Sequence, residues 1–302
     1  MNIFAKIFMV DTIIVMAGGM SSRMKKSEDS DLESSKLQQA NNTRKSLITF
    51  GKSNKPFIYF LLKNIDEAKF KTVILVVSKD YQNFKNIIDG FSSDFSLKIH
   101  FAIQKIPNDR IKPLGTADAV YQALNQFPHL KQASFCVCNS DNLYSIKAFN
   151  LVKENDFENT FLAYDRDYLE FPKDRVSSFS VVKLDTDNKL IAIIEKPTES
   201  QINESLDNEN KIRVSMNVFK FSGPKFFEYL ENCPFDPIRI EKEIPTAMMN
   251  MINNGGSYVT GIPIAEHVPD LTSKSDIHRI NKLFDWTWKI ENDFLFLIEW
   301  YN

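Results

Sequence analysis

Residues 12–24 read TIIVMAGGMSSRM, an apolar run followed by two neighbouring glycines and then by an arginine. The run is typical of a buried strand. Because glycine has no Cβ, a glycine pair lets the backbone turn tightly and approach a ligand, with its N–H groups free to face phosphate oxygens. Arg23 adds positive charge. The stretch predicts an anion site at the end of a strand, although alone it also fits an ordinary turn between a strand and a helix.

The rest of the first half alternates strand and helix patterns. Four further apolar runs have the length of strands: 72–78, 100–104, 134–141 and 159–164. Between them lie segments with apolar residues at helical spacing: 55–68, 80–91 and 115–127. Thr116 is predicted to be the N-cap of the last helix. The alternation predicts an α/β fold, a Rossmann-like, doubly wound and mostly parallel central sheet flanked by helices, with ligands at the carboxyl ends of its strands.

The second half is less regular and predicts a mixed sheet. Residues 177–185 and 189–197 form an expected hairpin, and two more strands are expected at 213–221 and 257–264. Two polar segments, 25–44 and 198–211, are predicted to be exposed loops that are mobile without ligand. A segment from about residue 275, rich in Trp and Phe, predicts an amphipathic helix packed on the body.

Composition excludes several classes of protein. The 302 residues are 43% hydrophobic and 25% charged with a net charge of −2, which predicts a globular core and no nucleic-acid partner. Asp11 interrupts the N-terminal apolar run, so we expect a strand there instead of a signal peptide, with translation starting at Met1 or Met9. The absence of long apolar stretches predicts no membrane partner. Three cysteines, read as buried free thiols, suit a reducing cytoplasm.

Six motifs follow one another in the order seen in a known enzyme family. AGGMSSRM (17–24) with Lys45, Gln104 with PLGTADAV (113–120), NSDNLYS (139–145), EKP (195–197), VSMNVFKF (214–221) and DLTSKSD (270–276) span nearly the whole chain. The ordered set resembles the sugar-1-phosphate nucleotidyltransferases of the glucose-1-phosphate thymidylyltransferase and uridylyltransferase type. The resemblance implies transfer of a nucleotidyl group from a nucleoside triphosphate, dTTP or UTP, to a sugar 1-phosphate, with Mg²⁺ as cofactor and release of pyrophosphate.

The resemblance also implies a role for particular residues. Arg23 and Lys45 would hold the β- and γ-phosphates, Asp141 and Asp270 would hold Mg²⁺, and Lys196 would bind the sugar phosphate. The implied substrate- and nucleotide-binding residues are Ala17, Gly18, Gly19, Gln104, Leu114, Gly115, Thr116, Glu195 and Asn217.

Three positions depart from the family pattern. Ser21 replaces the third glycine of the loop, Arg44 replaces the proline before the lysine, and Thr272 replaces the glycine of the last motif. The stretch between Arg23 and Lys45 is also longer than usual. No charge that the chemistry needs is lost.

A nucleotidyl transfer to a phosphate makes its own demands on the protein. A sugar-phosphate oxygen must attack the α-phosphorus of a second anion, so the protein must supply cations and position more than acids and bases. Two alternatives stay open: transfer to a polyol or amino-alcohol phosphate, suggested by the SSRM loop, and a non-catalytic binder of nucleotides or nucleotide sugars. A homo-oligomer also stays open.

The organisation that we expect is one nucleotidyltransferase domain. Its nucleotide-binding half covers about 9–145 and its sugar-phosphate-binding half about 146–276. A C-terminal helical segment covers about 275–302.

Overall fold

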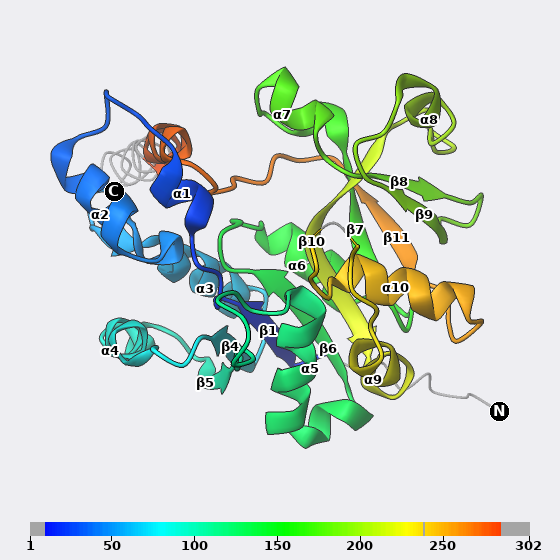
Figure 1. Ribbon diagram of the computed structural model, residues 1–302, viewed down its shortest axis with the longest axis horizontal. Coiled ribbons are helices and arrows are strands. Elements are labelled where there is room, and N and C mark those ends of the chain that lie inside the picture. Colours follow the sequence, from blue (N-terminus) through cyan, green and yellow to red (C-terminus); the bar gives the residue numbers. More distant parts are fainter. Residues whose placement is uncertain (1–9, 238, 285–302) are drawn as a thin grey trace, which may run out of the picture.

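The chain folds around one mixed sheet, shown in Figure 1. The structure is a computed structural model that describes residues 10–237 and 239–284. Within these residues the strands follow the order β11-β7-β10-β6-β1-β4-β5, and the β8–β9 hairpin extends from β10. The bounds are β1 (Thr12–Met16), β4 (Thr72–Val77), β5 (Lys98–Ile103), β6 (Ser134–Asn139), β7 (Thr160–Asp165), β8 (Val181–Leu184), β9 (Leu190–Ile194), β10 (Arg213–Ser222) and β11 (Thr260–Ile264). A separate ribbon pairs β2 (Thr49–Phe50) with β3 (Lys55–Pro56).

Strand direction matches the predicted fold class. Strands β6, β1, β4 and β5 are parallel to one another, and β11 is parallel to β7. Only β10, within the main path of the sheet, runs antiparallel to both of its neighbours, β6 and β7. The prediction of a mostly parallel sheet that becomes mixed in the second half is therefore confirmed, and the sheet is continuous through both halves.

Helices cover both faces of the sheet (Figure 1). On one face lie α3 (Phe57–Glu67), α4 (Gln82–Asp89) and α6 (Ile146–Lys153), and on the other lie α5 (Thr116–Gln126), α9 (Gly223–Glu231) and α10 (Ile244–Asn253). Successive residues of β1 divide between the two cores, with Ile13 and Val15 in the first and Ile14 in the second. Since strand side chains alternate in direction, burial of both faces explains why the strand is apolar throughout.

The two segments predicted to be loops contain helices, so that expectation is wrong. Residues 25–44 include the end of α1 (Ser22–Lys26) and all of α2 (Ser34–Asn42). Ala40 of α2 is fully buried in a cluster with Leu271, Ile277 and Ile280. The cluster thus includes partners more than 200 positions away, which the local composition of the segment could not reveal.

The segment 198–211 contains α8 (Glu199–Asn203), begun by a capping box in which Thr198 and Gln201 bond each other's backbone N–H groups. The predicted hairpin is present, with Asn188 at φ 61° in its turn. Its first strand starts later than predicted, because Lys173–Ser177 forms the short helix α7.

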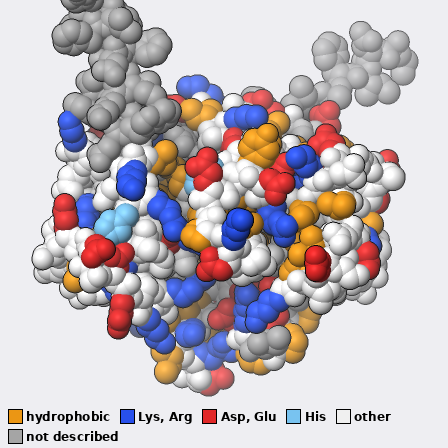
Figure 2. Space-filling model, turned by 90° about the horizontal axis from the view of Figure 1, so that it is seen from above, with side chains coloured by type: hydrophobic (Ala, Val, Ile, Leu, Met, Phe, Trp, Pro, Cys, Tyr) orange, Lys and Arg blue, Asp and Glu red, His pale blue; other side chains and the backbone are white. Residues whose placement is uncertain are grey.

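The C-terminal segment, the cysteines and the surface charge were also the subject of predictions. The chain is helical over 274–284, whereas 285–302 and the alternative starts Met1 and Met9 lie outside the described residues. The cysteines Cys136, Cys138 and Cys233 are buried and free, as expected. Within the described ranges, helices long and apolar enough to cross a membrane are absent. The face seen in Figure 2 carries interspersed basic and acidic side chains.

Candidate functional site

The glycine loop connects β1 to α1 and lies beside the end of β4. Ala17 N–H donates to the Val76 carbonyl at 2.8 Å, so the loop leaves the sheet only after this bond. A Cβ on Gly18 would lie 3.3 Å from the side-chain oxygen of Gln104, whereas a Cβ on Gly19 would meet nothing within 4 Å. Gly18 thus permits a close approach to Gln104, and Gly19 borders open space.

Ser21 has a structural use at the position where the family pattern has glycine. Its φ of 56° lies in the left-handed region, which disfavours most side chains. Its hydroxyl accepts a hydrogen bond from Lys45 N–H at 3.0 Å. The substitution therefore ties the backbone of Lys45 to the glycine loop.

A cavity of about 360 Å³ opens at the carboxyl ends of β1 and β6. It brings together nine of the predicted site residues: Ala17, Gly18, Gly19, Arg23, Lys45, Gln104, Gly115, Thr116 and Asp141. An adjoining groove of about 760 Å³ shares Gly18, Gly19, Arg44 and Gln104 and continues past the ends of β4 and β5. The predicted residues that line neither space are Leu114, Asp270, Glu195, Lys196 and Asn217.

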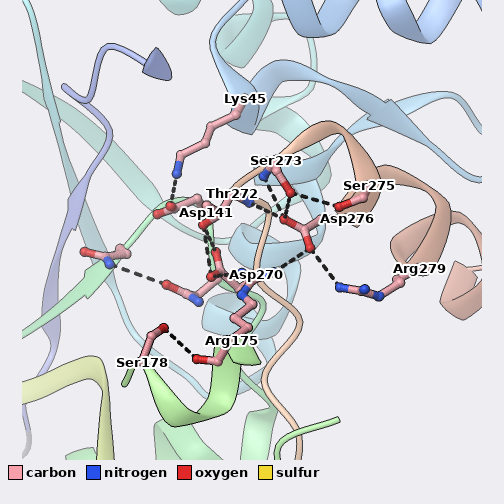
Figure 3. A network of polar contacts seen from close by, with 12 residues as sticks. Lys45, Asp141, Arg175, Ser178, Asp270, Thr272, Ser273, Ser275, Asp276 and Arg279 are labelled. Atoms are coloured by element: carbon pink, nitrogen blue, oxygen red, sulfur yellow. Dashed lines mark hydrogen bonds and ion pairs between the residues drawn. The ribbon is translucent and has the colours of Figure 1, made fainter. Parts of the chain in front are cut away.

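Lys45 and Asp141 form an ion pair within this cavity (Figure 3). Lys45 follows α2, and Asp141 lies two residues beyond the end of β6. Both side chains are about one-fifth exposed, at 19% and 17%, so the pair is shielded yet reachable from solvent. The two residues are 96 positions apart in the chain, and the fold alone brings them together.

Arg44 fixes the segment that carries Lys45. Its guanidinium donates to the carbonyl oxygens of Ala17 at 3.1 Å and Asp80 at 3.3 Å, and to the Ser78 hydroxyl. Burial lowers the pKa of Arg44. Sequence reasoning noted Arg44 only as a departure from proline; its position next to Lys45 was the signal that could have identified it.

Asp270 lies on the strand-like segment beside Asp141. Asn142 and Asp270 form an antiparallel bridge, and Leu271 N–H donates to the Asp141 carbonyl at 2.8 Å. Burial, followed by the nearby charge of Asp141, raises the pKa of Asp270 to about 6, although Arg175 and Lys45 act in the opposite direction. Asp270 is therefore adjacent to the cavity although it does not line it.

Arg175 of α7 is a further residue that the sequence did not reveal. Its guanidinium bridges Asp270 and Asp276 (Figure 3). The second oxygen of Asp276 accepts from the N–H groups of Thr272 at 3.0 Å and Ser273 at 2.7 Å. Asp276 thus fixes the turn after Asp270, and Arg175 attaches α7 to that turn.

The amide of Gln104 has a defined orientation. Its nitrogen donates to the Gly115 carbonyl at 3.0 Å and to the Asp118 carboxylate at 2.8 Å. Both partners are acceptors, so the nitrogen must face them and the oxygen must face the glycine loop. Asp118 is only 6% exposed, and it was missed because it lies inside a helix.

The predicted base-binding segment packs against the backbone near Lys242. Lys242 N–H donates to the Leu114 carbonyl at 2.5 Å, and Ala117 N–H donates to the Lys242 carbonyl at 2.9 Å. Gly115 has φ 116°, and a Cβ there would lie 2.4 Å from the Lys242 oxygen. Glycine is therefore required at this position.

Thr116 is not the N-cap of α5, contrary to prediction; Gly115 is the N-cap. The Thr116 hydroxyl instead donates to the Glu243 carboxylate at 2.5 Å and accepts from Ile244 N–H at 2.9 Å. The hydroxyl is therefore used at the start of α10, a contact that the local sequence could not indicate. Burial raises the pKa of Glu243, with Glu241 adding to the effect.

The residues predicted to bind the sugar phosphate lie outside the cavity that contains Lys45 and Asp141. Glu195 and Lys196 follow β9 and are exposed, and Glu195 lies 3.8 Å from Arg239. Asn217 sits at φ 60° where the register of β10 shifts. The Tyr144 hydroxyl donates to the carbonyls of Met216 at 2.7 Å and Asn217 at 3.1 Å. These residues do not line the cavity around Lys45.

The carboxylates nearest the cavity limit which metal could bind. Among the described residues, no cluster of three or more His, Cys, Asp or Glu side chains has the geometry of a metal site. Asp141 and Asp270 supply two neighbouring carboxylates. Mg²⁺ commonly binds one or two carboxylates and completes its shell with water and substrate phosphates, so this donor set fits it.

Comparison with known proteins identifies the class. The sequence pattern of the family described as nucleotidyl transferase matches residues 39–260. The chain belongs to that family, as the ordered motifs predicted.

Two curated proteins and one solved structure are similar to this chain. The chain is 28% identical over 247 residues to the bifunctional protein GlmU of Methanococcus maripaludis, covering 80% of this chain and 51% of that protein. It is 27% identical over 234 residues to the glucose-1-phosphate adenylyltransferase of Photobacterium profundum, covering 72% and 50%. The chain thus spans about half the length of these curated relatives. A structure described as a glucose-1-phosphate thymidylyltransferase from Bacillus anthracis has the same fold, with a TM-score of 0.64, 18% identity and coverage of 90% and 94%.

Proposed function

We propose that this protein transfers a nucleotidyl group from a nucleoside triphosphate, dTTP or UTP, to a sugar 1-phosphate and releases pyrophosphate. The observation that carries the proposal is the convergence of Arg23, Lys45 and Asp141 with the glycine loop around one cavity. The cavity lies at the carboxyl ends of parallel strands, where α/β sheets bind their ligands. The name of one relative, a glucose-1-phosphate adenylyltransferase, supports the same class of reaction.

The triphosphate side of the site is assigned to the first half of the chain. Arg23 and Lys45 hold the β- and γ-phosphates, and the backbone N–H groups of the loop formed by Ala17, Gly18 and Gly19 face phosphate oxygens. Gln104 presents its side-chain oxygen to an N–H group of the base, and Leu114, Gly115 and Thr116 border the base. Positive charge at these points offsets the repulsion between the two anionic substrates.

We assign a divalent cation, Mg²⁺, to Asp141 and Asp270. When bound, it supplies charge stabilisation at the α-phosphoryl group, where negative charge accumulates in the transition state. Asp141 lies in the turn two residues beyond the end of β6, and Leu271 N–H holds that turn by donating to the Asp141 carbonyl.

The acceptor side is assigned to the second half. Lys196 binds the sugar phosphate, while Glu195 and Asn217 contact the sugar. An oxygen of the sugar phosphate attacks the α-phosphorus in line, and the bond to the bridging oxygen of pyrophosphate breaks as the new P–O bond forms. Lys196 and Glu195 do not line the cavity in this structure, so the proposal places the acceptor phosphate between the cavity and the end of β9.

The continuous sheet supports treating both halves as one catalytic domain. The three buried free cysteines suit a reducing compartment, so we also propose a cytoplasmic location.

A pyrophosphate-release screen tests the function. The four ribonucleoside triphosphates and dTTP are each combined with a panel of sugar 1-phosphates and Mg²⁺, and polyol and amino-alcohol phosphates form a second panel. Release with dTTP or UTP and a sugar 1-phosphate is expected. Release only with the second panel would replace the acceptor class, and nucleotide binding without release on any pair would replace the enzyme with a binding protein.

A further inference from the structure

Both carboxylates assigned to the divalent cation already carry a positively charged partner from the protein. Lys45 is paired with Asp141, and Arg175 is paired with Asp270. Figure 3 shows the two cations approaching the carboxylates from opposite sides, Lys45 from one and Arg175 from the other. In this arrangement one basic side chain of the protein is paired with each of the two carboxylates.

Arg175 comes from the second half of the chain, and its side chain packs against a neighbouring aromatic ring. It lies on α7 (Lys173–Ser177), and its guanidinium stacks over the Phe171 ring, 4.4 Å from the ring centre. Its side chain is 18% exposed. The guanidinium is thus at the edge of the protein interior, close enough to solvent to exchange one anionic partner for another.

Asp276 does not depend on Arg175, whereas Asp270 has few other partners. Asp276 is also bonded by Arg279 at 3.2 Å and by the N–H groups of Thr272 and Ser273. Asp270 otherwise accepts only from the Thr272 hydroxyl, at 3.0 and 3.1 Å, among the hydrogen bonds found in the described part of the chain. Loss of Arg175 therefore removes the ion-pair partner of Asp270, whereas Asp276 keeps its other hydrogen-bond donors.

A guanidinium and a divalent cation compete for Asp270. The bond from Arg175 goes to Oδ2 of Asp270, and a metal bound to the same oxygen would also repel the guanidinium. When a cation occupies Asp270, Arg175 therefore loses this partner. A freed guanidinium with a planar fork of donors is well suited to a phosphate group.

We propose that Arg175 is a binding residue for the phosphate of the acceptor, stored on Asp270 until the divalent cation takes that carboxylate. This assignment rests on the proposed function and adds a residue to its acceptor site. Lys45 and Arg23, both from the first half, serve the triphosphate, and Arg175 serves the second anion from the opposite side. Binding of the cation thereby makes a phosphate-binding group available on the acceptor side.

The first arm of the test measures cation binding without any substrate. Mn²⁺ is used as the probe for titration of the free protein, followed by electron paramagnetic resonance. Arg175→Ala should bind Mn²⁺ about 3- to 10-fold more tightly than wild type, because the competing charge is gone. Arg279→Ala is the matched control, since it removes a cation that contacts Asp276 and not Asp270, and its Mn²⁺ affinity should stay within about twofold. Unchanged Mn²⁺ affinity in Arg175→Ala would overturn the proposal.

The second arm measures the acceptor directly. Glucose 1-phosphate is titrated calorimetrically into Mn²⁺-saturated protein, and Arg175→Ala should bind it at least about 10-fold more weakly, with partial recovery in Arg175→Lys. Equal affinity in wild type and Arg175→Ala would overturn the proposal even if Mn²⁺ binding changed. Circular dichroism melting confirms that each variant is folded.

The two proposals fail in different ways. Absence of pyrophosphate release from wild type on every substrate pair would remove the proposed function, yet both binding arms would still give their answer for Arg175. Turnover by wild type, combined with an unchanged KM for the sugar phosphate in Arg175→Ala, would remove the assignment of Arg175 alone.

Discussion

Arg44 donates a hydrogen bond to the carbonyl oxygen of Ala17 at 3.1 Å and thereby attaches the residue before Lys45 to the glycine loop. The same guanidinium reaches Ser78 and Asp80 beyond the end of β4. Together with the bond from Lys45 N–H to Ser21, these contacts hold Lys45 in place after the long excursion through α2.

We expect Arg44→Ala to raise KM for the nucleoside triphosphate by about 10-fold or more and to lower the free energy of unfolding by about 1–3 kcal/mol. The reason is that three acceptors lose a charged donor at once. Steady-state kinetics and urea denaturation measure the two effects. Lys79→Ala is a suitable control, because Lys79 lines the adjoining groove without any of these bonds; equal effects in both variants would contradict the positioning role.

Two glycines of the site should respond differently to alanine. Gly115→Ala should lower the free energy of unfolding by about 2–4 kcal/mol, because φ is 116° and the new Cβ would lie 2.4 Å from the Lys242 oxygen. Gly19→Ala should change it by less than about 1 kcal/mol, since its Cβ meets nothing within 4 Å. Thermal and urea denaturation distinguish them, and similar stabilities for the two variants would contradict the role of the Lys242 contact.

Asp118→Asn should make the protein less selective among nucleoside triphosphates that differ in their base. The carboxylate fixes the Gln104 nitrogen, whereas an asparagine can accept or donate and therefore permits both amide orientations. The ratio of kcat/KM for the preferred and second-best nucleoside triphosphate should fall by about 5- to 10-fold. Gln122→Ala removes another donor to Asp118 and should preserve the ratio; an unchanged ratio in Asp118→Asn would show that the amide orientation does not select the base.

Asp270 should make the stability of the protein depend on pH. Its pKa is raised from 3.8 to about 6 in the folded state. Between about pH 4 and 6 the native protein therefore keeps a proton that the unfolded chain has already released. Stability relative to Asp270→Asn should therefore fall as pH rises from about 4 to 6, by at most about 3 kcal/mol. Urea denaturation of both proteins across this range measures the difference, and parallel curves would contradict the raised pKa.

The fold was predictable because its strands carry their own signal. Strand β1 and its neighbours are apolar on both faces, which only a sheet covered on both sides explains. Helix α2 gave no such signal. Its sequence SSKLQQANN has few apolar residues, and its buried Ala40 packs in a cluster that includes the distant Ile277 and Ile280.

The lining of the candidate cavity was predictable where a motif lies close to a strand end. Asp141 and the glycine loop are of this kind, and the fold brings them to one cavity. Asp118 was missed because it lies inside a helix, and Arg175 was missed because its partner Asp270 is 95 positions away. Thr116 was assigned to the wrong helix for the same reason, since its partner Ile244 lies 128 positions away.

The most direct test of the central claim is the rate of pyrophosphate release by Asp141→Asn on the best substrate pair. Asparagine keeps the shape of the side chain and removes the charge that faces Lys45 and the assigned cation, so the variant should fold while its rate falls on the order of 100- to 1000-fold. Asp187→Asn, at a side chain that is 71% exposed in the β8–β9 turn, should keep the wild-type rate. A folded Asp141→Asn protein that releases pyrophosphate as fast as wild type would contradict the account.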